Sequence, residues 1–391
     1  AGFGPTDASS GMNWTFTKDI ARRVTASLGA DQSPSAAQSG QVRDAAGLAD
    51  LWLDEAISFP RLSAPAVAWS RADWVEGTFE TWRKLGNPIV TSLSAAMGAL
   101  MSREAGPGEE FMKPMVRAAA SGMFAAQVGQ SVGRLSAEVL SVSDIGLPLG
   151  THPQVALLPS NIEAFGAELE SVTPSDVLLF LALRESARQR LFAAVGWLGP
   201  QLHALVEHYA RDITIDTSAL EQAIEQQLSA AMSADDLERA GQALAGKLFE
   251  PAVTPEQAEV LERLETLLAL VEGWVDEVVG HTMTRWMPNG QALTEVVRRR
   301  RAAGGPAESA LKSLVGLELR PRRTRDAANL WAAVRATRGA EARDAAWHHP
   351  DLIPTSSDLD DPLGYAEHGH QVVPDELDAE LQKLLDQEGG Q

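Results

Sequence analysis

An apolar stretch at residues 177–195 carries charged residues in the middle of its helical pattern. Its side chains are apolar around most of the circumference of a helix, which predicts that this helix is buried in the core. Arg184 and Arg188 are four residues apart and therefore share one face, with Glu185 beside them. Burying an unpaired charge is costly, so the fold must bring groups of opposite charge to this face.

A second predicted helix, at about residues 254–285, offers those partners. It begins with a threonine cap, a proline in the first turn and a glutamine at the reciprocal capping position. Glu272 and Asp276 lie four residues apart in its apolar part and share a face. The simplest arrangement is a salt-bridge cluster in which Arg184 pairs with Asp276 and Arg188 with Glu272. The alternative is that one or more of these side chains faces solvent.

The composition favours helix over sheet. Alanine, leucine, glutamate and arginine are abundant, whereas the chain has only 2 tyrosines. A short apolar run bounded by prolines, residues 155–159, is the best candidate for a strand. We therefore expect a mainly α fold with a small β-sheet. The predicted helices cover residues 16–30, 42–58, 71–84, 88–103, 110–130, 177–195, 201–211, 217–231, 234–248, 254–285, 291–302, 306–314, 324–338 and 375–386.

Composition also suggests a division of the chain into three parts. Residues 1–15 are mostly small and polar and predict a flexible lead-in. Residues 16–350 form the mainly helical domain, with 16–150 as a candidate helical subdomain. Residues 351–391 are rich in proline and aspartate and predict an acidic C-terminal tail. No apolar stretch approaches the length of a membrane span, so we expect no membrane association.

The chain contains no cysteine. This excludes disulfides, cysteine-based metal sites and a thiol nucleophile. A cysteine-free chain suits a reducing compartment, and the start of the sequence lacks the basic and apolar segments of a signal peptide. We therefore expect a cytoplasmic protein.

Charge is distributed unevenly along the sequence. The net charge is −20, and residues 351–391 alone carry 11 acidic residues against one lysine. Residues 281–350 carry 13 Arg and Lys against 6 Asp and Glu. Such an acidic chain repels phosphate, which argues against a nucleic-acid partner. We interpret the run Arg298–Arg301 as a basic helix C-terminus, onto which the acidic tail could fold, rather than as an anion-binding patch.

The 8 histidines give no strong metal-ligand pattern. His203 and His208 are five residues apart and diverge on a helix. Residues 367–370, Glu-His-Gly-His, could hold a metal weakly, but a solvated tail is the better interpretation. His281 ends the second charged helix and could approach its carboxylates, although a surface histidine is the better expectation for any one of them.

The two charged motifs resemble those of zincin metallopeptidases. A zincin carries His-Glu-x-x-His on a helix, where the histidines bind zinc and the glutamate is the general base. In gluzincins a later helix supplies Glu-x-x-x-Asp, with the glutamate as third ligand and the aspartate orienting a ligand histidine. Residues 184–188, Arg-Glu-Ser-Ala-Arg, resemble the first motif with both histidines replaced by arginine. Residues 272–276 match the second, although the gap of 84 residues between the motifs is longer than gluzincins usually have.

Further segments are similar to a zincin-like family of actinobacteria and their relatives. Members of that family are generally labelled zinc-dependent metalloproteases, or proteins of unknown function associated with deazaflavin-coenzyme biosynthesis. The resemblance runs from about Asn13 to Pro362 and implies a zincin-like arrangement of the central helices. The segments that carry it are residues 155–162, 190–192, 197–198, 272–273, 314–318 and 322–331.

The replacement of both histidines favours a catalytically inactive homologue. Arginine stays protonated and cannot bind zinc, and a mononuclear site needs three protein ligands. The resemblance makes Glu185 a vestigial general base and Glu272 the only remaining ligand position, so no metal cofactor is expected. Such a homologue would bind a protein or peptide in the former cleft. Trp274, next to Glu272, either fills that cleft or simply packs in the core.

Two other functions remain open. In the first, the protein is an active hydrolase with a rebuilt zinc site, in which Glu185 is still the base and metal is held by Glu272 and distant His or Asp residues. In the second, it is a structural or assembly protein whose charged tail docks partners. Bound zinc would distinguish the hydrolase from the other two.

Overall fold

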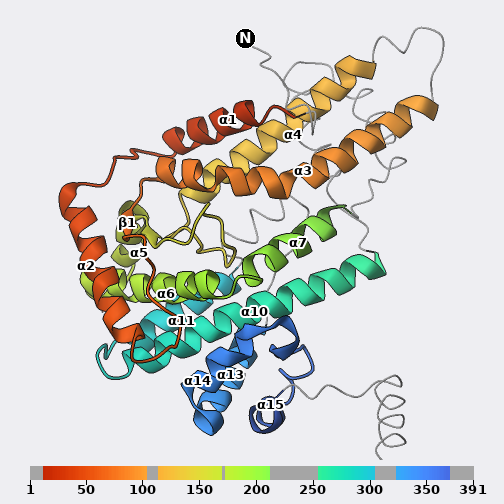
Figure 1. Ribbon diagram of the computed structural model, residues 1–391. Coiled ribbons are helices and arrows are strands. Elements are labelled where there is room, and N and C mark those ends of the chain that lie inside the picture. The colour runs from red at the N-terminus through yellow and green to blue at the C-terminus, as the bar shows by residue number, and fades with distance from the viewer. Residues whose placement is uncertain (1–11, 104–112, 170–171, 212–253, 304–322, 370–391) are drawn as a thin grey trace, which may run out of the picture.

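The computed structural model describes residues 12–103, 113–169, 172–211, 254–303 and 323–369 (Figure 1). Helices dominate these ranges, and two very short strands form the small sheet, so the expected mainly α fold class is confirmed. The predicted helices at 217–231, 234–248, 306–314 and 375–386 lie outside the described residues. The elements are α1 (Trp14–Ser27), α2 (Ala36–Leu53), β1 (Val67–Ala68), α3 (Arg71–Arg103), α4 (Lys113–Ser136), β2 (Ala156–Leu157), α5 (Pro159–Ala167), α6 (Pro174–Ala194), α7 (Leu198–Arg211), α10 (Pro255–Met283), α11 (Gly290–Ala302), α13 (Thr324–Arg338), α14 (Ala340–Ala345) and α15 (Pro362–His368).

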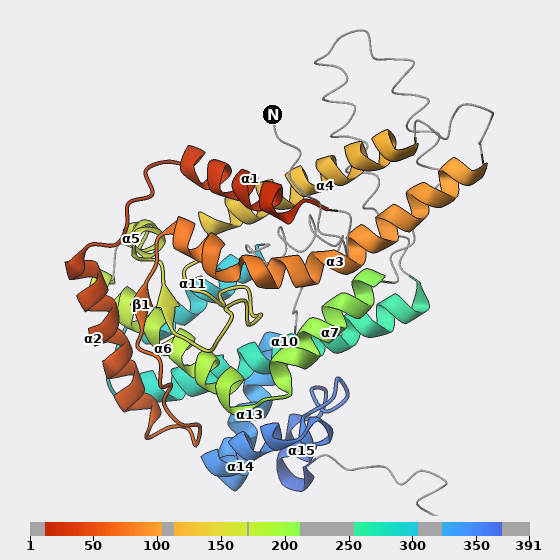
Figure 2. The ribbon, with the colours of Figure 1, turned by 45° about the horizontal axis from the view of Figure 1, so that its top comes forward.

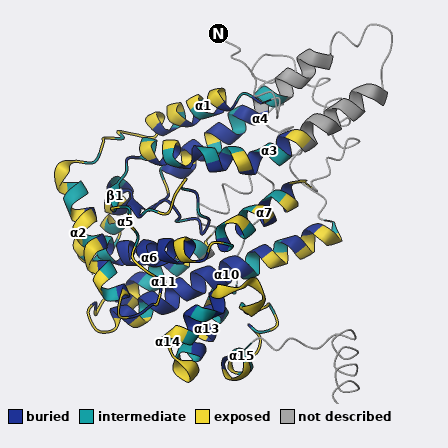
Figure 3. Cartoon of the chain, in the orientation of Figure 1, coloured by how far each residue is buried: buried dark blue, intermediate teal, exposed yellow. Residues whose placement is uncertain are grey.

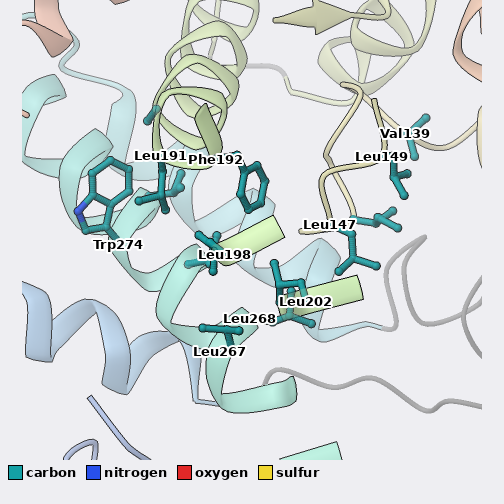
Figure 4. Close-up of a cluster of buried hydrophobic side chains, with 14 of the residues drawn as sticks. Val139, Leu147, Leu149, Leu191, Phe192, Leu198, Leu202, Leu267, Leu268 and Trp274 are labelled. Carbon is teal, nitrogen blue, oxygen red and sulfur yellow. The ribbon is translucent and has the colours of Figure 1, made fainter. Parts of the chain in front are cut away.

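Helices α6 and α10 lie at the centre of the structure. Helix α1 packs on α4 and α3, whereas α10 packs on α6, α7 and α13 and α2 packs on α6 (Figure 2). Both central helices are buried over most of their length (Figure 3). Their apolar side chains meet those of α7 and of the loop before β2 in one continuous core (Figure 4). Any charged group on their inner faces is therefore removed from water.

Local sequence signals explain where the two central helices begin. Thr173 caps α6 by accepting a hydrogen bond from the backbone N–H of Asp176, and a proline occupies the first turn. Thr254 and Gln257 form the reciprocal capping box expected for α10. These caps satisfy backbone donors at the helix ends, so both starts were predictable from the sequence.

The small sheet fixes the position of the loop before β2, which covers part of the candidate functional site. Strands β1 and β2 are parallel, with Val67 opposite Ala156. Ser141 forms an isolated antiparallel bridge to Leu157 on the other side of β2. The strand expected at 155–159 is confirmed but shorter, because Pro159 already begins α5. The pairing fixes the backbone around Ser141 against the core.

Several helix boundaries differ from the sequence-based expectation, and two of these differences have a clear physical cause. Helix α3 is continuous through Pro88, where a break was predicted, and buried Leu85, Ile89 and Val90 keep this part of the helix against the core. Helix α2 begins at Ala36 rather than at 42, because Ser35 and the glutamine three residues later form a capping box. Tertiary packing thus keeps α3 continuous, and capping moves the start of α2 toward the N-terminus, although α2 ends at Leu53 rather than at 58.

The described part of the segment that follows Pro350 packs on α13 through α15. Tyr365 of α15 is only 3% exposed, and its hydroxyl donates to the Leu352 carbonyl at 2.7 Å. The Arg338 guanidinium of α13 lies 5.8 Å from the centre of the Tyr365 ring. Residues 370–391, which hold most of the acidic tail, lie outside the described residues. None of the described helices is long and apolar enough to cross a membrane.

Candidate functional site

The charged faces of α6 and α10 meet in the core. Arg184 donates from Nη1 to Asp276 Oδ1 at 2.6 Å, and Arg188 donates from Nε to Glu272 Oε1 at 2.8 Å. This is the pairing that the sequence predicted. Both arginines also reach Glu272 Oε2, each at 3.1 Å. All four residues are at most 4% exposed, so the alternative of solvent-facing charges does not hold.

Helix α11 adds two more arginines to this group. Arg298 donates from Nε to Asp276 Oδ2 at 2.9 Å, and Arg301 Nη1 lies 2.5 Å from Glu272 Oε2. Four guanidinium groups therefore surround two carboxylates. We call Arg184, Arg188, Glu272, Asp276, Arg298 and Arg301, together with Glu185, the arginine–carboxylate cluster.

Sequence reasoning missed the contribution of α11. The run Arg298–Arg301 was interpreted as a helix C-terminus that the acidic tail could cover. The structure instead directs Arg298 and Arg301 into the cluster, and Arg300 donates to Asp144 Oδ2 at 3.1 Å. Arg299 alone is largely exposed, with Glu295 of its own helix as partner. The three-residue spacing of Arg298 and Arg301, which places them on one face, was the available signal.

Glu185 accepts more hydrogen bonds than the other carboxylates of the cluster. It accepts hydrogen bonds from Ser141 Oγ at 2.7 Å, Ser143 Oγ at 2.8 Å, Gln189 Nε2 at 2.9 Å and Arg188 Nη1 at 2.9 Å. The residue is fully buried. A general base needs a free lone pair within reach of the water it activates. The described contacts engage both oxygens of Glu185 with the loop before β2 and with its own helix.

The electrostatic environment keeps the carboxylates of Glu272 and Asp276 ionised. Burial raises the pKa of Glu272, but the surrounding Arg188, Arg301 and Arg184 outweigh it, and the pKa lies well below its usual value. The pKa of Asp276 is lowered in the same way, with Arg184 as the main opposing charge to burial. Burial lowers the pKa of Arg301. Each ionised carboxylate thus depends on the guanidinium groups around it.

A second buried charge network lies on the other side of α10. Arg343 donates from Nη1 to Glu277 Oε2 at 2.6 Å and from Nε to Asp344 Oδ1 at 2.8 Å. Asp344 also accepts from Trp274 Nε1 at 3.0 Å and from the backbone N–H of Ser58 at 2.8 Å. Trp274 therefore packs in this network and does not fill a cleft at the cluster. The alanine-rich sequence around Arg343 gave no signal that these charges are buried.

Sequence comparison identifies the family to which these helices belong. Residues 12–366 match the sequence model of the zincin-like metallopeptidases. The chain belongs to this zincin-like family. No curated protein is similar in sequence to this chain.

The same fold occurs in a solved structure from Chloroflexus aurantiacus. That protein is described as having a novel fold and is provisionally assigned as a hydrolase. It is 19% identical in sequence, with a TM-score of 0.62 over 91% of this chain and 98% of the other. The likeness shows that the two proteins share a fold.

The residues of the cluster do not fit the zinc ion that zincins carry. The ligand positions assigned by the resemblance hold Arg184 and Arg188, whose guanidinium groups stay protonated and repel a cation. Both oxygens of Glu272, which the resemblance makes the third ligand, accept hydrogen bonds from arginines. In the described ranges, no three His, Cys, Asp or Glu residues are grouped so that they could hold a metal.

Three of the histidines considered from the sequence have their described contacts outside the cluster. His203 Nε2 lies 3.1 Å from the Pro148 carbonyl, and burial lowers its pKa. His281, at the end of α10, has its pKa lowered by burial and by Arg335, which pairs with Glu277 of the second network. His368 Nδ1 contacts the Gly364 carbonyl within α15. His370 lies outside the described residues.

Proposed function

We propose that this zincin-like protein is a non-catalytic homologue that acts by binding a protein or peptide. In this proposal, residues 184–188 are a degenerate zinc-binding motif, and the arginine–carboxylate cluster has taken the place of the metal. The observation that carries the proposal is the pairing of Arg184 and Arg188 with Glu272 and Asp276. A metallopeptidase would need these positions for zinc ligands.

The burial of the cluster supports a structural role for it. Salt bridges tie α6, α10 and α11 together, and Ser141 and Ser143 cover Glu185. A substrate carbonyl would have to displace these contacts before it could reach Glu185. A buried ion pair of this kind is strongly destabilising to break, which makes such an opening unfavourable.

An active hydrolase is the second candidate, favoured by the provisional assignment of the Chloroflexus aurantiacus protein as a hydrolase. In that case Glu185 would be the base, and zinc would be held by Glu272 and histidines or aspartates from elsewhere in the chain. The arginine donors on both oxygens of Glu272 speak against this candidate.

The metal content of the protein distinguishes the non-catalytic homologue from the active hydrolase. The purified protein is loaded briefly with zinc, desalted and analysed by elemental mass spectrometry, beside an Arg184→His/Arg188→His variant. We expect the natural sequence to retain no stoichiometric zinc, and the double variant to gain affinity because two imidazoles join Glu272. About one tightly held zinc per chain in the natural protein would overturn the proposal. Casein hydrolysis that is abolished by Glu185→Gln would overturn it as well.

A further inference from the structure

A groove lies between α2, α5 and the first turns of α6. Its volume is about 890 Å³. Val42 and Ile162 are buried at its base, and Leu48 of α2 remains 39% exposed beside it. Among the apolar side chains that line it are Val42, Ala45, Leu48, Ile162, Leu178 and Leu179.

This groove is separate from the arginine–carboxylate cluster. At about 100° per residue, Leu178 and Leu179 lie roughly on the opposite side of α6 from Arg184 and Arg188. No cluster residue lines the groove. A ligand could therefore occupy it without disturbing the buried ion pairs.

The charges at the groove have one sign. Asp44 of α2 and Glu163 of α5 are the only charged residues that line it, and both are exposed. Gln38 Nε2 donates to Glu163 Oε1 at 2.8 Å and links the two walls. An occupant with basic groups beside an apolar stripe would match this surface in both polarity and charge.

The walls suit a helix as occupant. They are themselves helices, and a groove between helices is a common receptor for an amphipathic helix with apolar residues at positions i, i+3, i+4 and i+7. Ala45, Gly166 and Ala167 line the groove with little or no side chain, which lets a helical backbone approach closely.

We propose that the groove binds an amphipathic helical segment of a partner protein, with its leucine-like side chains in the groove and its Lys or Arg residues at Asp44 and Glu163. This inference rests on the proposed function as a binding protein and names the chemistry of its partner. A second copy of the chain is disfavoured, because each copy carries a net charge of −20. The acidic segment 370–391 is disfavoured as occupant for the same reason.

The test uses three synthetic peptides of about 15 residues, or about four helical turns. The first has leucines at helical spacing and lysines on the other face. The second has the same residues in an order without that spacing, and the third has glutamate in place of lysine. Binding of each fluorescent peptide to the full chain is measured by anisotropy in the presence of EDTA.

Matched variants localise the binding. Leu48→Asp should weaken binding of the Leu/Lys peptide by about tenfold or more, because it places a charge against the apolar side chains of the peptide. The double variant Asp44→Lys/Glu163→Lys should bind the glutamate peptide more tightly than the Leu/Lys peptide. Leu51→Asp is the control: Leu51 is a 56% exposed leucine of the same helix that does not line the groove, and its substitution should leave binding within about twofold.

The expected result is tight binding of the Leu/Lys peptide only, lost in Leu48→Asp and kept in Leu51→Asp. Absence of binding, equal binding of the reordered peptide, or equal loss in the two leucine variants would overturn the groove proposal. Failure of the proposed function is distinguishable, since it appears as zinc retained by the same preparation when its metal content is measured before EDTA is added. If the protein retains zinc and still binds the peptide, the groove proposal stands and the proposal of a non-catalytic protein is overturned.

Discussion

Arg188 and Glu272 form a bidentate ion pair in the core, with Nε donating to Oε1 at 2.8 Å and Nη2 to Oε2 at 3.1 Å. The two residues are 84 positions apart in the sequence and are 2% and 4% exposed. Such fork-to-fork pairs are among the strongest charge-assisted hydrogen bonds. A buried pair is weak evidence that the charges add net stability, because their desolvation opposes the attraction. Removing one partner, by contrast, destabilises the fold strongly, because the other charge is left buried and unpaired.

Glu272→Gln should therefore be strongly destabilising. It leaves Arg184, Arg188 and Arg301 without their shared anion, and we expect a loss of about 3–5 kcal/mol in the free energy of unfolding. Urea unfolding followed by circular dichroism measures the change. The control is Glu295→Gln, which breaks an exposed pair with Arg299 four residues away and should change stability by less than about 0.5 kcal/mol. Equal effects of the two substitutions would contradict the structural role of the cluster.

Acid should weaken the cluster in a predictable range of pH. The pKa of Glu272 is lower in the folded than in the unfolded chain, as are those of Asp276 and Asp144, all held down by arginines against the effect of burial. The unfolded chain thus binds protons first, so the stabilising contribution is complete above the unfolded pKa values of about 4 and is lost as the pH falls below them.

The Glu272→Gln variant isolates this contribution. Its residue 272 does not titrate, so its unfolding free energy should fall less steeply between about pH 5 and pH 3 than that of the natural protein. The gap between the two proteins should narrow on acidification. Urea midpoints measured at a series of pH values test this, and parallel curves for the two proteins would contradict a depressed pKa of Glu272.

The pairing of the two central helices was predictable because charge burial leaves few solutions. Residues 177–195 are too apolar to face water, so Arg184 and Arg188 required anions, and Glu272 and Asp276 had the matching four-residue spacing. The helix starts at Thr173 and Thr254 were likewise predictable, because the capping residues are recognisable in the local sequence. These inferences needed no knowledge of the tertiary structure.

Other parts of the site depend on contacts that no local pattern encodes. Ser141 and Ser143 reach Glu185 only because the loop before β2 is fixed by strand pairing. The run Arg298–Arg301 has the composition of an exposed helix end, and although the spacing of Arg298 and Arg301 places them on one face, it does not indicate that this face meets α10. The continuous helix through Pro88 is a further case in which packing outweighed a local breaking signal.

Asp344 should be as important for stability as the residues of the cluster. It is fully buried and accepts from Arg343, Trp274 and Ser58, so Asp344→Asn replaces an acceptor oxygen by an amide NH₂ group that faces donors. We expect a loss of about 3 kcal/mol or more in the free energy of unfolding. Thermal and urea unfolding measure it. Asp351→Asn, at a residue whose side chain is 82% exposed, is the control and should have no measurable effect.

Gly273 should be irreplaceable because α10 and α13 touch at this position. A Cβ added there would lie 2.6 Å from the Cβ of Ala327 and 2.7 Å from the backbone nitrogen of Ala328, and backbone atoms cannot move aside cheaply. Gly273→Ala should therefore reduce the free energy of unfolding by about 1–3 kcal/mol or more through overpacking.

Gly280, two turns further along the same helix, is the matched control for that substitution. Apart from its two chain neighbours and the nearby backbone of its own helix, no atom lies within 4 Å of the position that its Cβ would occupy. Gly280→Ala should raise the free energy of unfolding by about 0.5–1 kcal/mol, because alanine restricts the unfolded chain and favours the helix. Opposite signs for the two glycine substitutions, measured by urea unfolding, would show that the close approach of α10 to α13 is the cause. A stabilising effect of Gly273→Ala would mean that the two helices lie further apart at this point than the structure places them.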